Sequence, residues 1–258
     1  MTAPATGTVP ATVPRRGIVV PTIAAAAAFA VLLSLGSWQL ERKAWKEGLI
    51  ATLAQRLQAP PVPLPAAAQW SRLSAADDEF RRVAATAEFL HDRQAVVYTL
   101  GSSMRDDGAA GSPGYWIFTP ARLADGAIVM VNRGFVPEAK RDPATRRDGD
   151  VKGPVNLTGV LRWPEPGGVF TPAADRARKM WFSRDSDAIA AAAGVTAAPF
   201  YVELEGPEPP GGLPRTGRLQ PVLPNNHLGY AMTWFGLAAV LAAVYGAWLV
   251  GARRKDPA

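Results

Sequence analysis

The stretch GIVVPTIAAAAAFAVLLSLGSWQL, residues 17–40, contains no charged side chain. A second uncharged stretch, LGYAMTWFGLAAVLAAVYGAWLVGA, occupies residues 228–252. A helix of about 20 apolar residues spans about 30 Å of bilayer hydrocarbon. The two stretches therefore predict transmembrane helices at residues 17–40 and 228–250.

The first stretch has an alternative interpretation as a cleaved signal peptide. Arg15 and Arg16 would form its basic start, and the small residues Ala28 and Ala30 would form its cleavage site. Cleavage there would leave VLLSLGSW as a new apolar terminus. The length of the uncharged stretch favours an uncleaved anchor.

Charge outside the two stretches indicates an orientation. Arg15, Arg16 and the basic tail at residues 253–255 favour both termini in the cytoplasm, although the ends of the long loop also carry cations. The intervening 187 residues, 41–227, form a loop of a length that translocates largely regardless of charge. We expect residues 1–16 and 251–258 to be cytoplasmic tails and residues 41–227 to lie on the opposite side of the membrane.

Composition excludes several classes of protein. The 258 residues include 28 basic and 22 acidic side chains, 48% apolar residues and no cysteine. That apolar content excludes disorder throughout, and the missing thiol excludes disulfide scaffolds, iron–sulfur clusters, thioether-bound heme and thiol-based copper chaperones. The basic residues are dispersed along the chain, which argues against a nucleic-acid partner.

The central segment predicts a helix followed by a β-rich domain. Good helix formers continue the first helix over residues 41–58, and the proline-rich residues 59–65 end it. A short helix with polar starters and a terminal glycine is expected at residues 184–193. The fold class is thus an α+β membrane protein, with two transmembrane helices flanking a small antiparallel β-rich extracytoplasmic domain. The predicted strands are residues 80–90, 94–101, 115–122, 127–136, 155–163 and 200–205.

One of the two histidines raises the question of hydrolase chemistry. His91 precedes Asp92 at the end of a predicted strand, and a surface turn is the more common setting for such a pair. No nucleophile elbow, phosphate-binding loop or zinc-protease motif occurs in the chain. A hydrolase would require a serine or aspartate beside His91 in a cleft.

The other histidine stands at the start of the second apolar stretch. His227 follows two asparagines suited to cap a helix, and helical spacing places it on one face with Tyr230 and Trp234. Such a histidine is either an interfacial side chain in an aromatic belt or a metal ligand directed at the other helix. A neutral imidazole binds heme iron through one ring nitrogen, and His227 is therefore a candidate heme ligand.

The end of the first stretch supplies candidate partners for that site. Trp38 and Arg42 share a helix face with Trp45, while Gln39 and Lys46 form an adjoining polar edge. The cations are suited to pair with carboxylates such as heme propionates. The alternative is that they snorkel to the membrane surface beside an anchoring tryptophan.

Four separated blocks of the sequence form a recognisable set: GSWQLERKAWKEGLI at residues 36–50, GYWIFTP at 114–120, VNRGFVP at 131–137 and NNHLGYAMTWF at 225–235. In this order they resemble the Surfeit locus protein 1 family of cytochrome c oxidase assembly factors. Phe135 stands where the family pattern leads us to expect tryptophan.

The resemblance implies a non-enzymatic protein of the bacterial inner membrane that promotes insertion of heme a into the large oxidase subunit. It implies a transient, non-covalent heme a site with His227 as the iron ligand, lined by Trp38, Gln39, Arg42, Tyr230 and Trp234. The implied partners are the large subunit of cytochrome c oxidase, membrane lipid and, as a further candidate, heme a synthase. The alternative is a membrane-anchored adaptor that scaffolds the oxidase subunit without binding heme.

Overall fold

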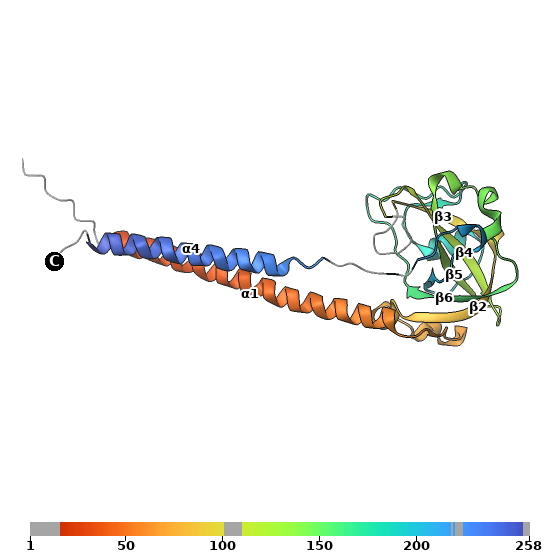
Figure 1. The fold of residues 1–258 in the computed structure, drawn as a ribbon, viewed down its shortest axis with the longest axis horizontal. Coiled ribbons are helices and arrows are strands. Elements are labelled where there is room, and N and C mark those ends of the chain that lie inside the picture. The colour runs from red at the N-terminus through yellow and green to blue at the C-terminus, as the bar shows by residue number, and fades with distance from the viewer. Residues whose placement is uncertain (1–15, 101–109, 218, 220–223, 255–258) are drawn as a thin grey trace, which may run out of the picture. The chain divides into compact units, whose positions relative to one another are not determined.

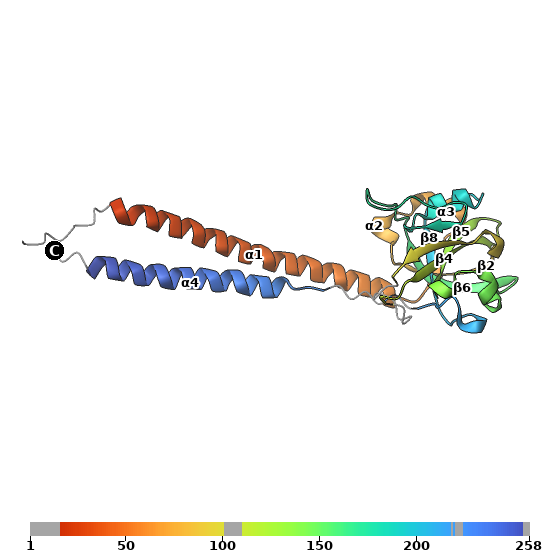
Figure 2. The ribbon, with the colours of Figure 1, turned by 90° about the horizontal axis from the view of Figure 1, so that it is seen from above.

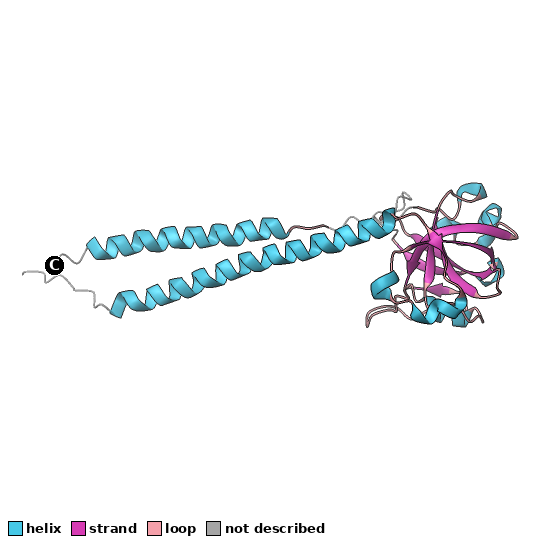
Figure 3. Ribbon diagram, turned by 90° about the horizontal axis from the view of Figure 1, so that it is seen from below, coloured by secondary structure: helices cyan, strands magenta, loops and turns pink. Residues whose placement is uncertain are grey.

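The computed structural model describes residues 16–100, 110–217, 219 and 224–254. The chain forms two compact units. One unit comprises Met1–Ile50 and Pro224–Ala258, and the other comprises Ala51–Leu223. Both long helices of the chain and the strands of the second unit are drawn in Figure 3.

The first unit is a pair of antiparallel helices, α1 (Arg16–Gln58) and α4 (His227–Arg254), which lie side by side in Figures 1 and 2. The hydroxyl groups of Thr22 and Tyr245 form a hydrogen bond between them. Ala231 and Ala238 of α4 are buried. Both helices are long and apolar enough to cross a membrane. Helix α1 includes residues 41–58 and passes from the first unit into the second.

The second unit contains eight strands among the residues that the structure describes. Their order in the sheet is β1-β2-β6-β8-β5-β4-β3-β7, and an additional pairing of β2 with β4 closes strands β2, β6, β8, β5 and β4 into a barrel. Two short helices, α2 (Ala75–Asp78) and α3 (Ser186–Ala192), accompany the sheet. The strands are β1 (Val62–Pro63), β2 (Arg82–Phe89), β3 (Ala95–Thr99), β4 (Gly114–Leu123), β5 (Ile128–Pro137), β6 (Pro154–Arg162), β7 (Met180–Trp181) and β8 (Tyr201–Glu205).

The sheet is mixed, so the expected antiparallel architecture is wrong in part. Strand β8 runs parallel to β5, and the short strands β1 and β7 run parallel to β2 and β3. Between β5 and β8 the chain passes through β6, β7 and α3, and a connection of that length permits the two strands to run parallel. All six predicted strands are present and α3 lies where a short helix was expected, whereas β1 and β7 are too short to leave a pattern.

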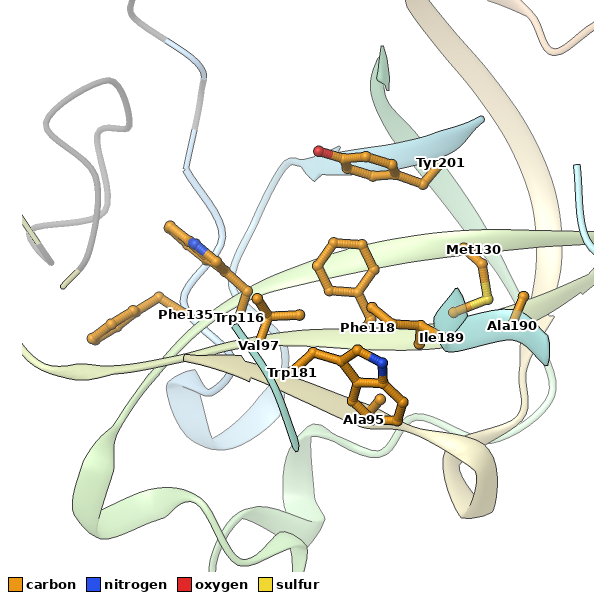
Figure 4. Packing of buried hydrophobic residues seen from close by; sticks show 10 residues of the cluster. All are labelled: Ala95, Val97, Trp116, Phe118, Met130, Phe135, Trp181, Ile189, Ala190 and Tyr201. Carbon is orange, nitrogen blue, oxygen red and sulfur yellow. The ribbon is translucent and has the colours of Figure 1, made fainter. Parts of the chain in front are cut away.

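Two apolar clusters form most of the interior. Phe135, which stands where tryptophan was expected, is fully buried and packs edge-on against Trp116 with ring centroids 5.7 Å apart. The second cluster centres on Phe200 and Leu161. The first cluster, drawn in Figure 4, contains Ala95, Val97, Trp116, Phe118, Met130, Phe135, Trp181, Ile189, Ala190 and Tyr201.

A buried ionic cluster lies beside these cores. The Arg162 guanidinium contacts the carboxylates of Glu203 and Glu79, each at 3.2 Å, and that of Glu165 at 2.5 Å. The backbone carbonyl of Glu79 accepts a hydrogen bond from Arg56 in the last turn of α1 at 2.9 Å. Leu57 of the same turn is buried. The last turns of α1 are therefore part of the β unit.

Candidate functional site

The candidate site centres on a hydrogen bond between the two long helices. Nδ1 of His227 lies 2.7 Å from Oε1 of Gln39. Because this amide oxygen can only accept, Nδ1 carries the proton. A neutral imidazole with its proton on Nδ1 has a lone pair on Nε2, and a metal binds to such a nitrogen. His227 is the first residue of α4 and is half-buried.

Neighbouring contacts fix the start of α4 against α1. Nζ of Lys46 donates a hydrogen bond to the carbonyl of Pro224 at 2.5 Å. The carbonyl of Asn226 accepts from the Tyr230 amide at 3.3 Å and begins the helical pattern. Lys46 lies seven residues after Gln39 and so falls on the same face of α1. That face holds both the histidine and the segment before it.

The structure brings only two of the six expected site residues into direct contact. Gln39 and His227 meet, and Trp234 is half-buried. Trp38 and Tyr230 are exposed to 53% and 59%, and Arg42 is exposed as well. These three side chains therefore lie at the surface of the helix pair.

Helical geometry nevertheless places the exposed three on one flank of the helix pair. At about 100° per residue, Trp38 and Arg42 turn to the same side of Gln39. Tyr230 turns in the same sense from His227. Because the helices are antiparallel, rotations in the same sense about the two axes bring all three side chains to the same side of the helix pair. The Arg42 guanidinium lies on that flank, stacked 3.8 Å from the centroid of the Trp45 ring.

The packing that supports this contact was not predicted from the sequence. Gly36 is buried against the ring of Phe235, less than one turn from Gln39. A glycine in an uncharged helix is a weak signal, because such residues also occur on lipid-facing surfaces. The partner ring lies almost 200 residues away in the chain. Only the three-dimensional fit identifies the pair.

His91 lies in a different environment. Its Nε2 donates to the carbonyl of Val151 at 2.9 Å, so its Nδ1 accepts from Arg133 at 3.1 Å. Asp150 is 3.2 Å from Nδ1 but is also ion-paired with Arg133 at 3.1 Å. Burial lowers the pKa of the Arg133 guanidinium, and the hydrogen bond and charge of Asp150 oppose that decrease.

This arrangement does not resemble a catalytic triad. Both ring nitrogens of His91 are engaged, and no serine or threonine hydroxyl forms a hydrogen bond with the ring among the described residues. The nearby carboxylate that a hydrolase required is present as Asp150, but it neutralises Arg133. The lack of enzymatic activity stays a prediction.

The donor set also bears on the type of metal site. Within the described ranges, no three His, Asp or Glu side chains gather where they could hold a metal ion. A lone imidazole suits a metal whose other ligands come from a macrocycle. His227 fits that requirement because its second ring nitrogen is already held by Gln39.

Comparison with known proteins identifies the family. The model of the SURF1 family matches residues 26–239, from within α1 to within α4. The chain belongs to the SURF1 family. The match includes both Gln39 and His227, so the helix contact described above lies inside the region that defines SURF1 proteins.

Individual SURF1 relatives are similar over most of the chain. Surfeit locus protein 1 of Rattus norvegicus is 34% identical over 224 residues, which cover 84% of this chain and 71% of the relative. The human protein of that name is 34% identical over 222 residues, with coverages of 82% and 71%. A SURF1-like protein of Monosiga brevicollis is 36% identical over 223 residues, with coverages of 83% and 82%. These three relatives are eukaryotic.

Proposed function

We propose that the chain is a membrane-anchored assembly factor of cytochrome c oxidase that binds heme a transiently at His227 and delivers it to the large oxidase subunit. The observation that carries this proposal is the hydrogen bond from Nδ1 of His227 to Gln39. Ligating histidines generally donate their other ring N–H to an oxygen acceptor, which fixes the tautomer and the ring orientation. The Gln39 side chain performs that role here.

Delivery of a cofactor requires a ligand that also releases it. One non-covalent imidazole meets that requirement better than the thioether links of c-type heme, and the chain has no cysteine to form such links. The exposed guanidinium of Arg42 is suited to pair with a propionate. Trp38, Tyr230 and the half-buried Trp234 supply aromatic surface for a macrocycle beside the histidine.

Membrane anchoring is the second part of the proposal. The uncharged parts of α1 and α4 exceed the length needed to cross a bilayer, and apolar side chains such as Val20 and Met232 are exposed to 71% and 68%. Exposed apolar helix surface on this scale requires an apolar solvent. We infer a bacterial inner-membrane protein with both termini in the cytoplasm and the β unit in the periplasm. Heme a synthase is the corresponding donor of the heme.

The second candidate function is an adaptor that scaffolds the oxidase subunit without touching heme. The same hydrogen bond supports it, because a bond from His227 to Gln39 also joins two helices. Interhelical hydrogen bonds of this kind stabilise helix pairs in membranes. In that case Nε2 of His227 binds no iron, and the β unit alone contacts the oxidase subunit.

A spectrum of the purified protein separates the two functions. The full chain is expressed in a host that makes heme a, purified in detergent, and examined by a reduced-minus-oxidised spectrum. We expect the wild type to carry heme a, H227A to lose most of it, and H91A to retain it per folded molecule. A colourless wild type that still co-purifies with the large oxidase subunit would establish the adaptor instead.

A further inference from the structure

Two apolar side chains of the β unit project almost completely into solvent. Val169 and Phe170 are exposed to 97% and 98%, more than any other large apolar side chain that the structure describes. We call this pair the apolar tip. Two adjacent large apolar side chains exposed to this extent make the apolar tip a candidate contact site.

The turn that carries the apolar tip is built by specific contacts. The amide of Thr171 donates to the carbonyl of Gly168 at 3.0 Å, which places Val169 and Phe170 at the two corners of a β-turn. A Cβ on Gly167 would come within 2.8 Å of the Thr171 side chain. Glycine at this position therefore allows the loop to fold back closely and present the two apolar corners outward.

Cations follow the apolar tip on the same loop. Residues 175–179 contain Arg176, Arg178 and Lys179 against the single acid Asp175, a net charge of 3 − 1 = +2. All three cationic residues are exposed, and the Arg178 side chain is exposed to 72%. Asp175 neutralises little of this charge, since its carboxylate lies 3.7 Å from Arg178 at the surface. An apolar projection beside net positive charge matches the chemistry of an anionic lipid surface.

The base of this loop is tied to the last turns of α1. Glu165, four residues before the apolar tip, contacts the Arg162 guanidinium at 2.5 Å. Arg162 contacts the Glu79 carboxylate at 3.2 Å, and the Glu79 carbonyl is held by Arg56 of α1 at 2.9 Å. Within the β unit, the loop thus starts at the end where the anchoring helix joins.

We propose that the apolar tip inserts into the headgroup region of the bilayer, with Arg176 and Arg178 contacting anionic phosphates. The inference rests on the membrane anchoring in the proposed function. In the proposed function the helices tether the β unit to the bilayer, which raises the effective concentration of lipid around that unit, so a weak contact suffices. The adjacent cations favour lipid over an apolar protein groove as the occupant.

The absence of cysteine makes a direct test possible. Single-cysteine variants of the full chain are labelled with a nitroxide and reconstituted in nanodiscs of phosphatidylcholine, with or without phosphatidylglycerol. Collision of the label with oxygen, which partitions into lipid, is compared with collision with a water-soluble nickel chelate. The test position is F170C. The reference positions are I23C in α1 and A124C in the exposed turn between β4 and β5.

The expected ratio of oxygen to nickel collisions at F170C is several-fold above that at A124C in nanodiscs with phosphatidylglycerol, and lower without it. Adding R176Q and R178Q should remove the dependence on the anionic lipid.

If I23C reports lipid while F170C matches A124C in both lipids, insertion of the apolar tip is wrong and anchoring stands. If I23C itself reports water, the proposed anchoring fails. A label at F170C that is immobilised only when the oxidase subunit is added, without oxygen exposure, would assign the tip to a protein partner and overturn the inference.

Discussion

Gly36 of α1 lies directly against the ring of Phe235 of α4: a Cβ at Gly36 would come 2.5 Å from Cε1 of that ring. No real Cβ tolerates such a distance, so only glycine allows this approach of the two helices. Small residues serve the same purpose at helix contacts in membranes. Gly36 precedes Gln39 by less than one turn, and the close packing therefore also sets the reach of Gln39 to His227.

The first prediction concerns this contact. Gly36→Ala should force the Phe235 ring or the helix backbone aside and destabilise the helix pair by about 1–3 kcal/mol, the usual cost of overpacking. It should also lower heme occupancy by displacing Gln39. Thermal unfolding in detergent measures the first effect. Gly236→Ala is the matched control, because a Cβ there meets nothing within 4 Å. Equal melting temperatures for the two variants would contradict the prediction.

The second prediction isolates the role of Gln39. Gln39→Leu removes the acceptor of the His227 Nδ1–H, so the imidazole loses its fixed orientation and heme affinity should fall by about 10–100-fold. Gln39→Glu keeps an acceptor and should retain most of the affinity. Heme titration of the purified apo-protein, followed by absorbance, measures both. Ser37→Ala is the control on the exposed side of the same helix. If Gln39→Leu binds heme as the wild type does, the hydrogen bond has only a structural role.

The sequence was most informative where the signal is local. The uncharged stretches located α1 and α4, and short runs with β-branched and aromatic residues located the six longer strands. Gln39 and His227 were both named as site residues, although 188 positions separate them, because each lies in a motif at one end of an uncharged stretch. Their direct hydrogen bond could not be deduced, since the register of two antiparallel helices depends on fits such as that of Gly36.

The pairing of strands that are distant in the sequence was the hardest feature to predict. The parallel neighbour of β5 is β8, which lies more than 60 residues along the chain, and no pattern within either strand records that choice. The exposure of loop side chains was equally difficult to predict from the sequence. Val169 and Phe170 follow two glycines in a loop and belong to no periodic pattern, so the sequence did not distinguish buried side chains from exposed ones.

The third prediction concerns the buried ionic cluster. Arg162→Ala removes the guanidinium that contacts the Glu203 carboxylate, whose side chain is 1% exposed, and so upsets the charge balance of the interior. Removing one member of a buried pair typically costs about 3–5 kcal/mol, because the remaining charge stays desolvated. Arg178→Ala breaks a surface pair and should cost less than about 1 kcal/mol. Urea unfolding of the two variants measures the difference. Similar losses for both would show that solvent reaches Glu203.

The last prediction follows from Tyr201. Burial raises the pKa of its phenol, the charge of Arg184 opposes that increase, and the hydroxyl has no hydrogen-bond partner among the described residues. Above pH of about 10 the unfolded chain loses this proton while the folded chain keeps it. The free energy of unfolding should therefore be unaffected below that pH and fall above it, by up to about 1.4 kcal/mol per pH unit for this group.

Tyr201→Phe retains the ring that packs 5.2 Å from Phe118 and removes the ionisable hydroxyl, so it should reduce the alkaline slope by that amount. Urea unfolding at neutral pH is the internal control, because the phenol is uncharged there in both states. An unchanged alkaline slope in Tyr201→Phe would show that the folded chain releases this proton as readily as the unfolded chain does.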